Sequence, residues 1–554
     1  MHEADEPWWR GATLYQIYPR SFADSNDDGV GDLRGILRHL DNVASLGVDG
    51  IWISPFFRSP MRDFGYDVSD ACAVDPLFGT LADFDALLGE AHARGLKVLI
   101  DQVWSHTALE HPWFLESRRD RENPKADWYV WAEARPDGSP PNNWQSWMGG
   151  PAWTWEPRRG QYYLHNFLRE MPDLNFHCEE VQEAILGIAD FWLRRGVDGF
   201  RLDTANFYFH DRSLRDNPPL PPSKRGTSPV LMQRHVHNVC QPGNLVFIER
   251  IRKLLDSHGG RMAVAEIGSA DNHGRMVEYT SGEKRLHTAY SFLLLGERQG
   301  PAQIARHMEA WQKGVATSAW PAWAFSNHDA PRVASRWAAP EATPELWLTL
   351  LLCLRGTLFL YQGEELGLPQ AELSLEQIQD PFGKANWPLN KGRDGCRTPM
   401  PWTSEGPAAG FSTVTPWLPV PAEHARLCVE NQEAQPASCL QLTRRLLALR
   451  RAHPALRLGS FRALETEGGL LVFERSQAED RLLVAVNLGA QEREVRLPAG
   501  TALDEVVFQL QGSRVNGNRV SLCAGSAVIG KLKLHEQLLD CHRAYPQKSL
   551  KILQ

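Results

Sequence analysis

Short β-rich runs alternate with helical patterns through most of this chain, and this alternation constrains the fold more than any other feature. The stretch from Leu33 to Leu46, for example, carries apolar residues at helical spacing. Eight repeats of this kind favour a closed (β/α)8 barrel, an α/β fold, and no G-x-G-x-x-G turn of a doubly wound sheet follows an early strand. The predicted strands are Tyr15–Tyr18, Gly50–Ser54, Leu96–Asp101, Gly199–Asp203, Met262–Glu266, Ala289–Phe292, Trp323–Asn327 and Thr357–Tyr361.

Two irregular stretches and a change of pattern predict further units. A Trp-rich insert follows the third strand, and a Pro-rich stretch from about Glu364 to Pro421 follows the eighth, so both could wall a pocket at one end of the barrel. After residue 457 the pattern turns to strands, with a hairpin motif at Val515–Asn518, which predicts a C-terminal antiparallel β-domain. The predicted units are the catalytic barrel (1–105 and 173–457), an inserted subdomain (106–172) and the β-domain (458–554), with a poorly patterned tail from about residue 530.

Composition narrows the class of protein. The net charge is -8 and no run of Lys or Arg occurs, which argues against nucleic acid as a partner. We find no apolar stretch long enough for a membrane span and no secretory signal at the acidic N-terminus. The nine cysteines are scattered without a C-x-x-C pair, as expected for reduced thiols. These features predict a cytoplasmic protein without disulfides or structural zinc.

Polar residues stand where the predicted strands end. Asp101, Asp203 and Glu266 close the third, fourth and fifth strands, and His328 and Asp329 follow the seventh. The carboxyl ends of the strands carry the active site in (β/α)8 barrels. A lone Asp after a strand is more often a turn or helix cap, so the argument depends on the set.

The residues around these positions resemble a known family. Asp101–His106, Gly199–Asp203, Ala265–Glu266 and Phe325–Asp329 match, in order, the conserved regions of the α-amylase family, glycoside hydrolase family 13. Met171–Asn175 and Gly356–Gly363 resemble its secondary motifs. The chain most resembles the α-glucosidase and oligo-1,6-glucosidase branch of this family. Three segments carry this resemblance: Tyr15–Phe22, Phe64–Asp67 and Arg393–Trp402.

The resemblance implies roles for individual residues. Asp203 would be the nucleophile, Glu266 the general acid/base, and Asp329 would bind sugar hydroxyls at the cleaved residue. Tyr66 would stack on that sugar, although a buried tyrosine can also be plain core. Asp63 and Arg397 would pair at the pocket floor. The implied substrate-binding residues are Asp63, Tyr66, His106, Arg201, His328 and Arg397.

Cleavage of a glycoside with retention requires one ionised and one protonated carboxyl, about 5–5.5 Å apart. Arg201 lies two residues before Asp203 on the same strand face, where its positive charge favours the ionised nucleophile. Glu266 faces a second carboxylate, Asp329, so we expect its pKa to be raised. A covalent glucosyl intermediate could pass to water or to an alcohol or sugar acceptor, which predicts transglucosylation.

The loop before the first helix suits a hard cation. Its oxygen-bearing residues alternate, and Gly29 allows a tight turn. The loop resembles the calcium or magnesium loop of this branch, where the carbonyl of Val30 would also bind. An acidic helix N-terminus is the alternative, because Asp32 directly precedes a helix. The candidate ligands of this structural Ca²⁺ or Mg²⁺ are Asp24, Asn26, Asp28, Val30 and Asp32, and no organic cofactor is expected.

The predicted activity is that of a retaining, exo-acting α-glucosidase on short α-glucosides. Thr204 stands where enzymes of this branch that prefer α-1,6 bonds carry Val, which favours α-1,4 links such as maltose. Met171 replaces a usual Gln, and Ser105 a usual Asn. Oligo-1,6-glucosidase, trehalose synthase and sucrose-acting relatives remain alternatives. A non-enzymatic scaffold is disfavoured, because the complete set of catalytic carboxylates is retained.

Overall fold

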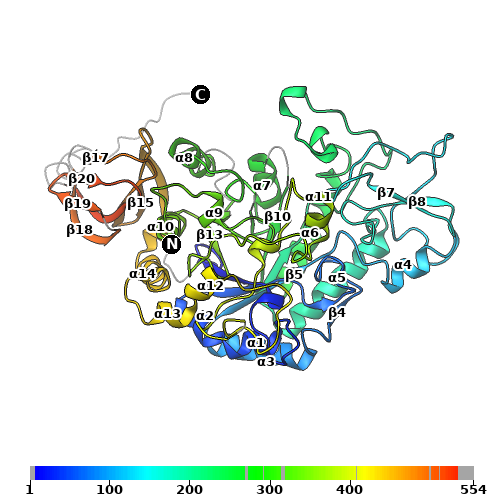
Figure 1. Cartoon of the computed structure of the whole chain (residues 1–554). Coiled ribbons are helices and arrows are strands. Elements are labelled where there is room, and N and C mark those ends of the chain that lie inside the picture. Colours follow the sequence, from blue (N-terminus) through cyan, green and yellow to red (C-terminus); the bar gives the residue numbers. More distant parts are fainter. Residues whose placement is uncertain are drawn as a thin grey trace, which may run out of the picture.

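The computed structural model describes residues 6–268, 272–290, 292–312, 319–406, 408–497, 501–510 and 512–534. Its centre is a closed barrel of eight parallel strands in the order β1-β13-β12-β11-β10-β9-β5-β2 (Figure 1). This confirms the predicted (β/α)8 fold. The barrel strands are β1 (Thr13–Ile17), β2 (Gly50–Ile53), β5 (Lys97–Gln102), β9 (Gly199–Leu202), β10 (Met262–Glu266), β11 (Thr288–Tyr290), β12 (Pro321–Ala324) and β13 (Thr357–Tyr361).

The seventh strand is displaced from its prediction. β12 ends at Ala324 and does not reach Asn327. The side-chain oxygen of Asn327 accepts hydrogen bonds from the backbone N–H groups of Asp329 and Ala330, which turns the chain there. This turn places His328 and Asp329 at the carboxyl end of the barrel. Ser291, in the predicted sixth strand, lies outside the described residues.

Helices surround the barrel (Figure 1). The single helix predicted from Leu33 to Leu46 consists of two, α1 (Leu33–Arg38) and α2 (Leu40–Leu46), because His39 leaves helical geometry. The Thr80 side chain caps α3 through a reciprocal capping box with Asp83. The other described helices of five or more residues near the barrel are α3 (Leu81–Ala93), α5 (Glu179–Arg195), α6 (Pro242–Ser257), α7 (Asn272–Thr280), α8 (Pro301–Ala310), α10 (Pro344–Cys353), α11 (Pro381–Asn386), α12 (Ala422–Arg426), α13 (Val429–Glu433) and α14 (Cys439–Ala452).

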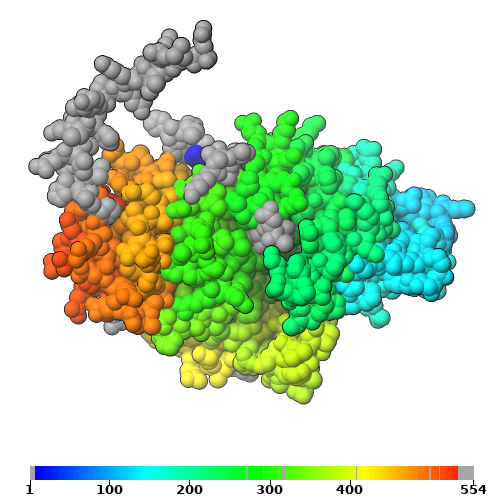
Figure 2. Space-filling view, turned by 90° about the horizontal axis from the view of Figure 1, so that it is seen from above, coloured from blue at the N-terminus to red at the C-terminus, as the bar shows by residue number. Residues whose placement is uncertain are grey.

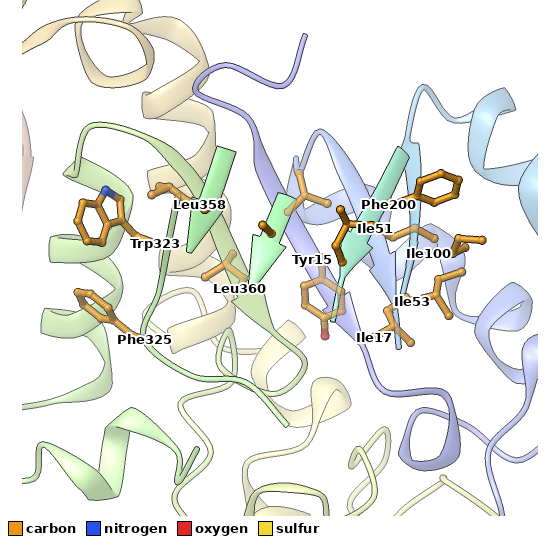
Figure 3. Close-up of a cluster of buried hydrophobic side chains, with 14 of the residues drawn as sticks. Tyr15, Ile17, Ile51, Ile53, Ile100, Phe200, Trp323, Phe325, Leu358 and Leu360 are labelled. Atoms are coloured by element: carbon orange, nitrogen blue, oxygen red, sulfur yellow. The ribbon is translucent and has the colours of Figure 1, made fainter. Parts of the chain in front are cut away.

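Alternation along the strands creates two apolar layers. Tyr15 and Ile17 of β1 belong to the large cluster that includes helix side chains, whereas Leu14 belongs to a smaller cluster inside the barrel. Figure 3 shows part of the outer layer, with side chains from β1, β2, β5, β9, β12 and β13. The interior layer includes Trp52 and Phe359. These two layers leave the carboxyl ends of the strands for polar residues.

The insert after β5 forms its own small unit at one end of the molecule (Figures 1 and 2). It contains α4 (Pro112–Ser117) and a three-stranded antiparallel sheet of β6 (Trp131–Ala132), β8 (Gln161–Leu164) and β7 (Trp153–Glu156). Trp144 and Trp153 are buried in its core, whereas Trp155 is exposed. Most of the tryptophans here serve packing.

The C-terminal strands lie at the opposite end of the molecule (Figure 2). Two antiparallel sheets have the orders β14-β15-β16-β21-β18 and β17-β20-β19. The predicted hairpin is confirmed, since Asn516 pairs with Arg519 across Gly517 and Asn518. The strands are β14 (Ser460–Glu465), β15 (Leu470–Gln477), β16 (Asp480–Asn487), β17 (Arg493–Arg496), β18 (Thr501–Gln509), β19 (Ser513–Asn516), β20 (Arg519–Leu522) and β21 (Ala527–Leu534).

The predicted tail is wrong in its first residues. β21 (Ala527–Leu534) pairs with both β16 and β18, so residues 530–534 are part of the sheet. Gly530, a residue depleted in strands, interrupts the short apolar run there, and the neighbours of the strand come from other parts of the C-terminal region. The rest of the predicted tail, 535–554, lies outside the described residues. No helix in the described part of the chain is long and apolar enough to cross a bilayer.

Candidate active site

One buried arginine gathers the acidic residues at the carboxyl ends of three neighbouring strands. Arg201 of β9 has no exposed side-chain surface. Its Nη1 donates to Asp101 Oδ1 at 2.9 Å and to Asp203 Oδ1 at 2.6 Å, and its Nη2 lies 2.8 Å from Glu266 Oε2. The two predicted catalytic carboxyls therefore share a single guanidinium and are neighbours in the site.

Glu266 is electrostatically suited to hold a proton. Burial, reinforced by the negative charges of Asp203 and Asp329, raises its pKa from 4.5 to about 8, against the opposing effect of Arg201. The raised pKa agrees with the expectation from sequence. Asp203 lies on the same guanidinium and accepts a second hydrogen bond from Thr204 Oγ1 at 3.2 Å. Glu266, which keeps a proton at neutral pH, thus lies beside the Asp203 carboxylate, which accepts hydrogen bonds from Arg201 and Thr204.

Thr204 has an unusual backbone conformation next to the nucleophile candidate. Its φ is +43°, in the left-handed region that β-branched residues rarely adopt. The conformation is held by Thr204 N–H on Glu266 Oε2 (3.2 Å) and by a hydrogen bond between Thr204 Oγ1 and Ser105 Oγ (2.9 Å). Such strain is often concentrated at functional sites. Here it turns the chain so that the Thr204 backbone and side chain both face the acidic pair.

The predicted aromatic and histidine residues lie beside this cluster. The Tyr66 ring stacks on the His328 ring, with centroids 5.3 Å apart and planes 3° from parallel. Its hydroxyl donates to Asp101 Oδ2 at 3.0 Å. Tyr66 is thus held by both His328 and Asp101, and only 6% of its surface is exposed. His106 Nε2 donates to the Tyr66 carbonyl oxygen at 3.1 Å, and burial lowers the pKa of His106.

The predicted pairing of Asp63 with Arg397 is wrong. Arg393 Nη2 lies 2.5 Å from Asp63 Oδ1 and 2.8 Å from Asp380 Oδ1, whereas Arg397 Nη2 donates to Asp329 Oδ1 at 2.7 Å. The short helix η6 (Asp394–Cys396) separates the two arginines by one turn and directs them differently. All six residues predicted to bind substrate are nevertheless close to the acidic cluster or to Asp329.

Asp329 lies among positive charges at this end of the barrel. Burial alone would raise its pKa, but the positive charges of Arg397, Arg393 and Arg201 lower it. Arg397 Nε also donates to the His328 carbonyl oxygen at 2.6 Å. Two arginines of the loop after β13, Arg393 and Arg397, therefore hold Asp329 in place. The Pro-rich stretch thus contributes residues to the site.

Sequence reasoning missed several residues of the site. Arg393 and Asp380 form its charged floor, and Tyr290 at the end of β11 lies 2.9 Å from Arg201 Nη2 through its hydroxyl. Arg393 was visible within the Arg393–Trp402 motif, whereas Tyr290 lay inside the predicted strand Ala289–Phe292 and became a strand end only because β11 stops at Tyr290. Nothing in the sequence marked Asp380, which is far from any predicted strand and meets Arg393 only because the loop folds back.

The candidate cation loop is ordered around its own carboxylates. Asp24 accepts hydrogen bonds from the backbone of Asn26, Asp27 and Gly29 and from Ser412 Oγ. Asp32 caps α1 through Gly35 N–H, as the alternative interpretation expected. In the described ranges, no group of three or more His, Cys, Asp or Glu side chains converges as a metal site would. The oxygen-only donor set still fits a hard cation if the amide of Asn26 and the Val30 carbonyl contribute.

Comparisons with known proteins identify the family of this chain. Residues 16–459 match the α-amylase catalytic domain. A probable alpha-glucosidase of Rhizobium meliloti (strain 1021) is 52% identical over 90% of this chain and 92% of its own. The crystal structure of the alpha-glucosyl transfer enzyme XgtA has a TM-score of 0.92 and 52% identity, over 96% of this chain and all of that one.

A solved structure of lower sequence identity contains a bound sugar. A mutant of MutB, crystallised in complex with the substrate sucrose, has a TM-score of 0.87 and 30% identity, over 95% of this chain and all of that one. The family match covers most of the chain, and the relatives are covered almost completely. This chain therefore belongs to the α-amylase family, glycoside hydrolase family 13, and falls among its α-glucosidases.

Proposed function

We propose that this protein is a retaining α-glucosidase in which Asp203 is the nucleophile and Glu266 the general acid/base. The observation that carries the proposal is the pair of carboxyls on the Arg201 guanidinium, of which Glu266 has a pKa near 8. A retaining glycosidase needs this division between a protonated acid and an ionised nucleophile. Asp329 would hold sugar hydroxyls, with the six predicted substrate-binding residues and Arg393 around the same glucose.

The proposed reaction has two steps. First, Glu266 donates its proton to the glycosidic oxygen while Asp203 bonds to the anomeric carbon, and the aglycone leaves as an alcohol. Next, the Glu266 carboxylate takes a proton from water, and the water oxygen displaces Asp203 to release α-glucose. A sugar or alcohol hydroxyl in place of water would give a new α-glucoside. Transfer is therefore part of the proposal.

For substrates, we favour short α-1,4-linked glucosides such as maltose. The support is Thr204, whose hydroxyl contacts Asp203 and Ser105 beside the cleaved bond. Enzymes of this branch that prefer α-1,6 links tend to carry an apolar Val at this position. Oligo-1,6-glucosidase activity is the second candidate, since the rest of the site does not distinguish the two links.

Proton NMR of maltose hydrolysis tests the proposal. We expect α-glucose to appear before its β anomer, together with transfer products at high maltose concentration. The matched variant D203N should lose at least about 10⁴-fold in kcat while its melting temperature shows that it is folded under the assay conditions. First appearance of β-glucose, or full turnover by D203N, would contradict the assignment. Faster cleavage of isomaltose than maltose would favour the second candidate instead.

We also propose that the loop from Asp24 to Asp32 binds one Ca²⁺ or Mg²⁺ that stabilises the fold. The loop carries oxygen donors at alternating positions, and, although partial burial opposes it, hydrogen bonds lower the pKa of Asp24. Chelation should lower the melting temperature, because a ligand at 100 times its Kd stabilises by about 2.7 kcal/mol. Excess Ca²⁺ should restore it in the wild type and not in D28N. An unchanged melting temperature after chelation would refute the proposal.

A further inference from the structure

Gln16, a buried amide on the first barrel strand, contacts one histidine of the site. It points into the barrel, between Tyr15 and Ile17, which face the helices, and is 1% exposed. Its Nε2 lies 2.8 Å from His328 Nδ1 and 3.2 Å from Ser54 Oγ. Neither the reaction nor sugar binding, as proposed above, gives this side chain a role.

The amide settles which nitrogen of His328 carries hydrogen. An amide nitrogen only donates, so His328 Nδ1 must accept with its lone pair. In this orientation one buried atom, Gln16 Oε1, has no partner among the described residues. Rotating the amide by half a turn would instead place its two N–H donors there without an acceptor, which costs more. The observed orientation is therefore the favourable one.

Two further contacts agree with that assignment. Burial lowers the pKa of His328 to about 3, so the ring is neutral and its single hydrogen lies on Nε2. His328 Nε2 faces Asp329 Oδ2 at 3.2 Å, and an N–H there meets the carboxylate favourably. With the hydrogen on Nδ1, a lone pair would face that charge. Both sides of the ring thus favour the same tautomer.

From His328 the hydrogen bonds run in one direction as far as Asp101, which shares the Arg201 guanidinium with the nucleophile. His328 Nε2 lies 2.5 Å from the Tyr66 hydroxyl, which can accept from it because its own hydrogen is donated to Asp101 Oδ2. The Asp101 carboxylate and Asp203 are then bridged by Arg201 Nη1. If Nε2 lacked its hydrogen, Tyr66 would have to donate to the ring, and Asp101 would lose a donor.

We propose that Gln16 is a positioning residue that holds His328 in its neutral Nε2–H form and thereby sets the direction of the hydrogen bonds through Tyr66 to Asp101, the carboxylate that shares Arg201 with Asp203. The proposal rests on the proposed function only where it invokes catalysis. Gln16 itself does not touch the reacting atoms. It acts through His328, Tyr66 and Asp101.

Neutron diffraction of the deuterated wild-type protein tests the assignment directly, without reference to activity. The expected result is deuterium on His328 Nε2 and two deuterons on the Gln16 atom that faces His328 Nδ1. Deuterium on Nδ1, with the Gln16 oxygen facing it, would overturn the proposal. This readout decides the matter even if the protein does not cleave maltose, so failure of the proposed function remains distinguishable.

Two variants of similar size separate positioning from packing. Q16M removes the donor but leaves both tautomers available, so kcat should fall by less than about 10-fold. Q16E replaces the donor by a carboxylate that accepts from Nδ1 and enforces the opposite direction. A wrongly held histidine tautomer lowers kcat by about 10⁴ in serine proteases, and we expect at least about 100-fold for Q16E.

The relation between the variants is the decisive kinetic result. Positioning through His328 predicts a kcat effect for Q16E far above that of Q16M, with KM changed less than kcat. Melting temperatures of both variants show whether each is folded under the assay conditions. Equal losses for Q16M and Q16E in folded protein, or a larger loss for Q16M, would show that Gln16 only fills space.

Discussion

Glu266 should reduce the stability of the folded protein at alkaline pH, and replacing it should restore that stability. The pKa of its carboxyl is raised from 4.5 to about 8, chiefly by burial. The folded state therefore binds this proton more tightly than the unfolded state. Stability is lost as the pH rises from about 4.5 towards 8, because in that range only unfolding releases the proton.

The size of the effect follows from the two pKa values. One pKa unit corresponds to about 1.4 kcal/mol. The cost of keeping Glu266 is then about 1 kcal/mol at pH 5 and about 5 kcal/mol at pH 9. The neutral variant E266Q avoids this cost at every pH. At about 2.1 cal/mol/K per residue, cooperative unfolding of the 554-residue chain would convert 5 kcal/mol into about 4 °C.

Scanning calorimetry of wild type and E266Q at pH 5 and pH 9, at one scan rate, measures the difference. We expect E266Q to melt about 1 °C above wild type at pH 5 and about 4 °C above it at pH 9. The control is E122Q, which changes an exposed carboxylate and should show no growing difference. A constant gap between wild type and E266Q across this pH range would refute the link between burial and proton binding.

Four further predictions follow from the site and its barrel. As the pH rises through about 8, kcat should fall in a pH–rate profile, because Glu266 loses the proton that it donates. R393M leaves buried carboxylates unpaired, so denaturant unfolding should show a loss of about 3–5 kcal/mol, and R393K a smaller one. T204V should change the maltose-to-isomaltose ratio of kcat/KM by about 10-fold in favour of isomaltose, measured by glucose release. G199A places a Cβ against a backbone oxygen of the neighbouring strand, and calorimetry should show a loss of about 3 kcal/mol, the upper end of what overpacking costs.

Much of the barrel could be predicted because each strand is a local pattern. β10 (Met262–Glu266) and β13 (Thr357–Tyr361) agree with their predicted bounds, since both are short apolar runs with clear ends. β12 was misplaced because the polar turn at Asn327 follows apolar residues without a break. β21 was missed, since its partners come from distant parts of the chain and residue propensity alone does not identify them.

Site residues on strand ends were predictable for the same reason, whereas pairings were not. Asp203 directly follows β9 and Glu266 is the last residue of β10, and the fold fixes these two strands as neighbours in the barrel. The partner of Asp63 depends on how the loop after β13 folds, and two arginines four residues apart compete for it. Sequence spacing alone cannot decide between them. Gln16 was visible in a motif, but only the His328 contact gives it a meaning.

The charges around the site do not cancel. With Glu266 protonated, five further carboxyls face three guanidinium groups, those of Arg201, Arg393 and Arg397. Burial raises the pKa of Asp101 to about 7, so this carboxyl is partly protonated at neutral pH, and the negative charges still outnumber the positive ones. The histidines cannot supply the missing cation, since burial keeps both neutral. A glucosyl group that gains positive charge as its bond breaks would be drawn into this deficit. A protonated amine of glucose-like shape should therefore bind more tightly than its neutral analogue. Inhibitors of this site would then depend on their positive charge more than on their shape complementarity.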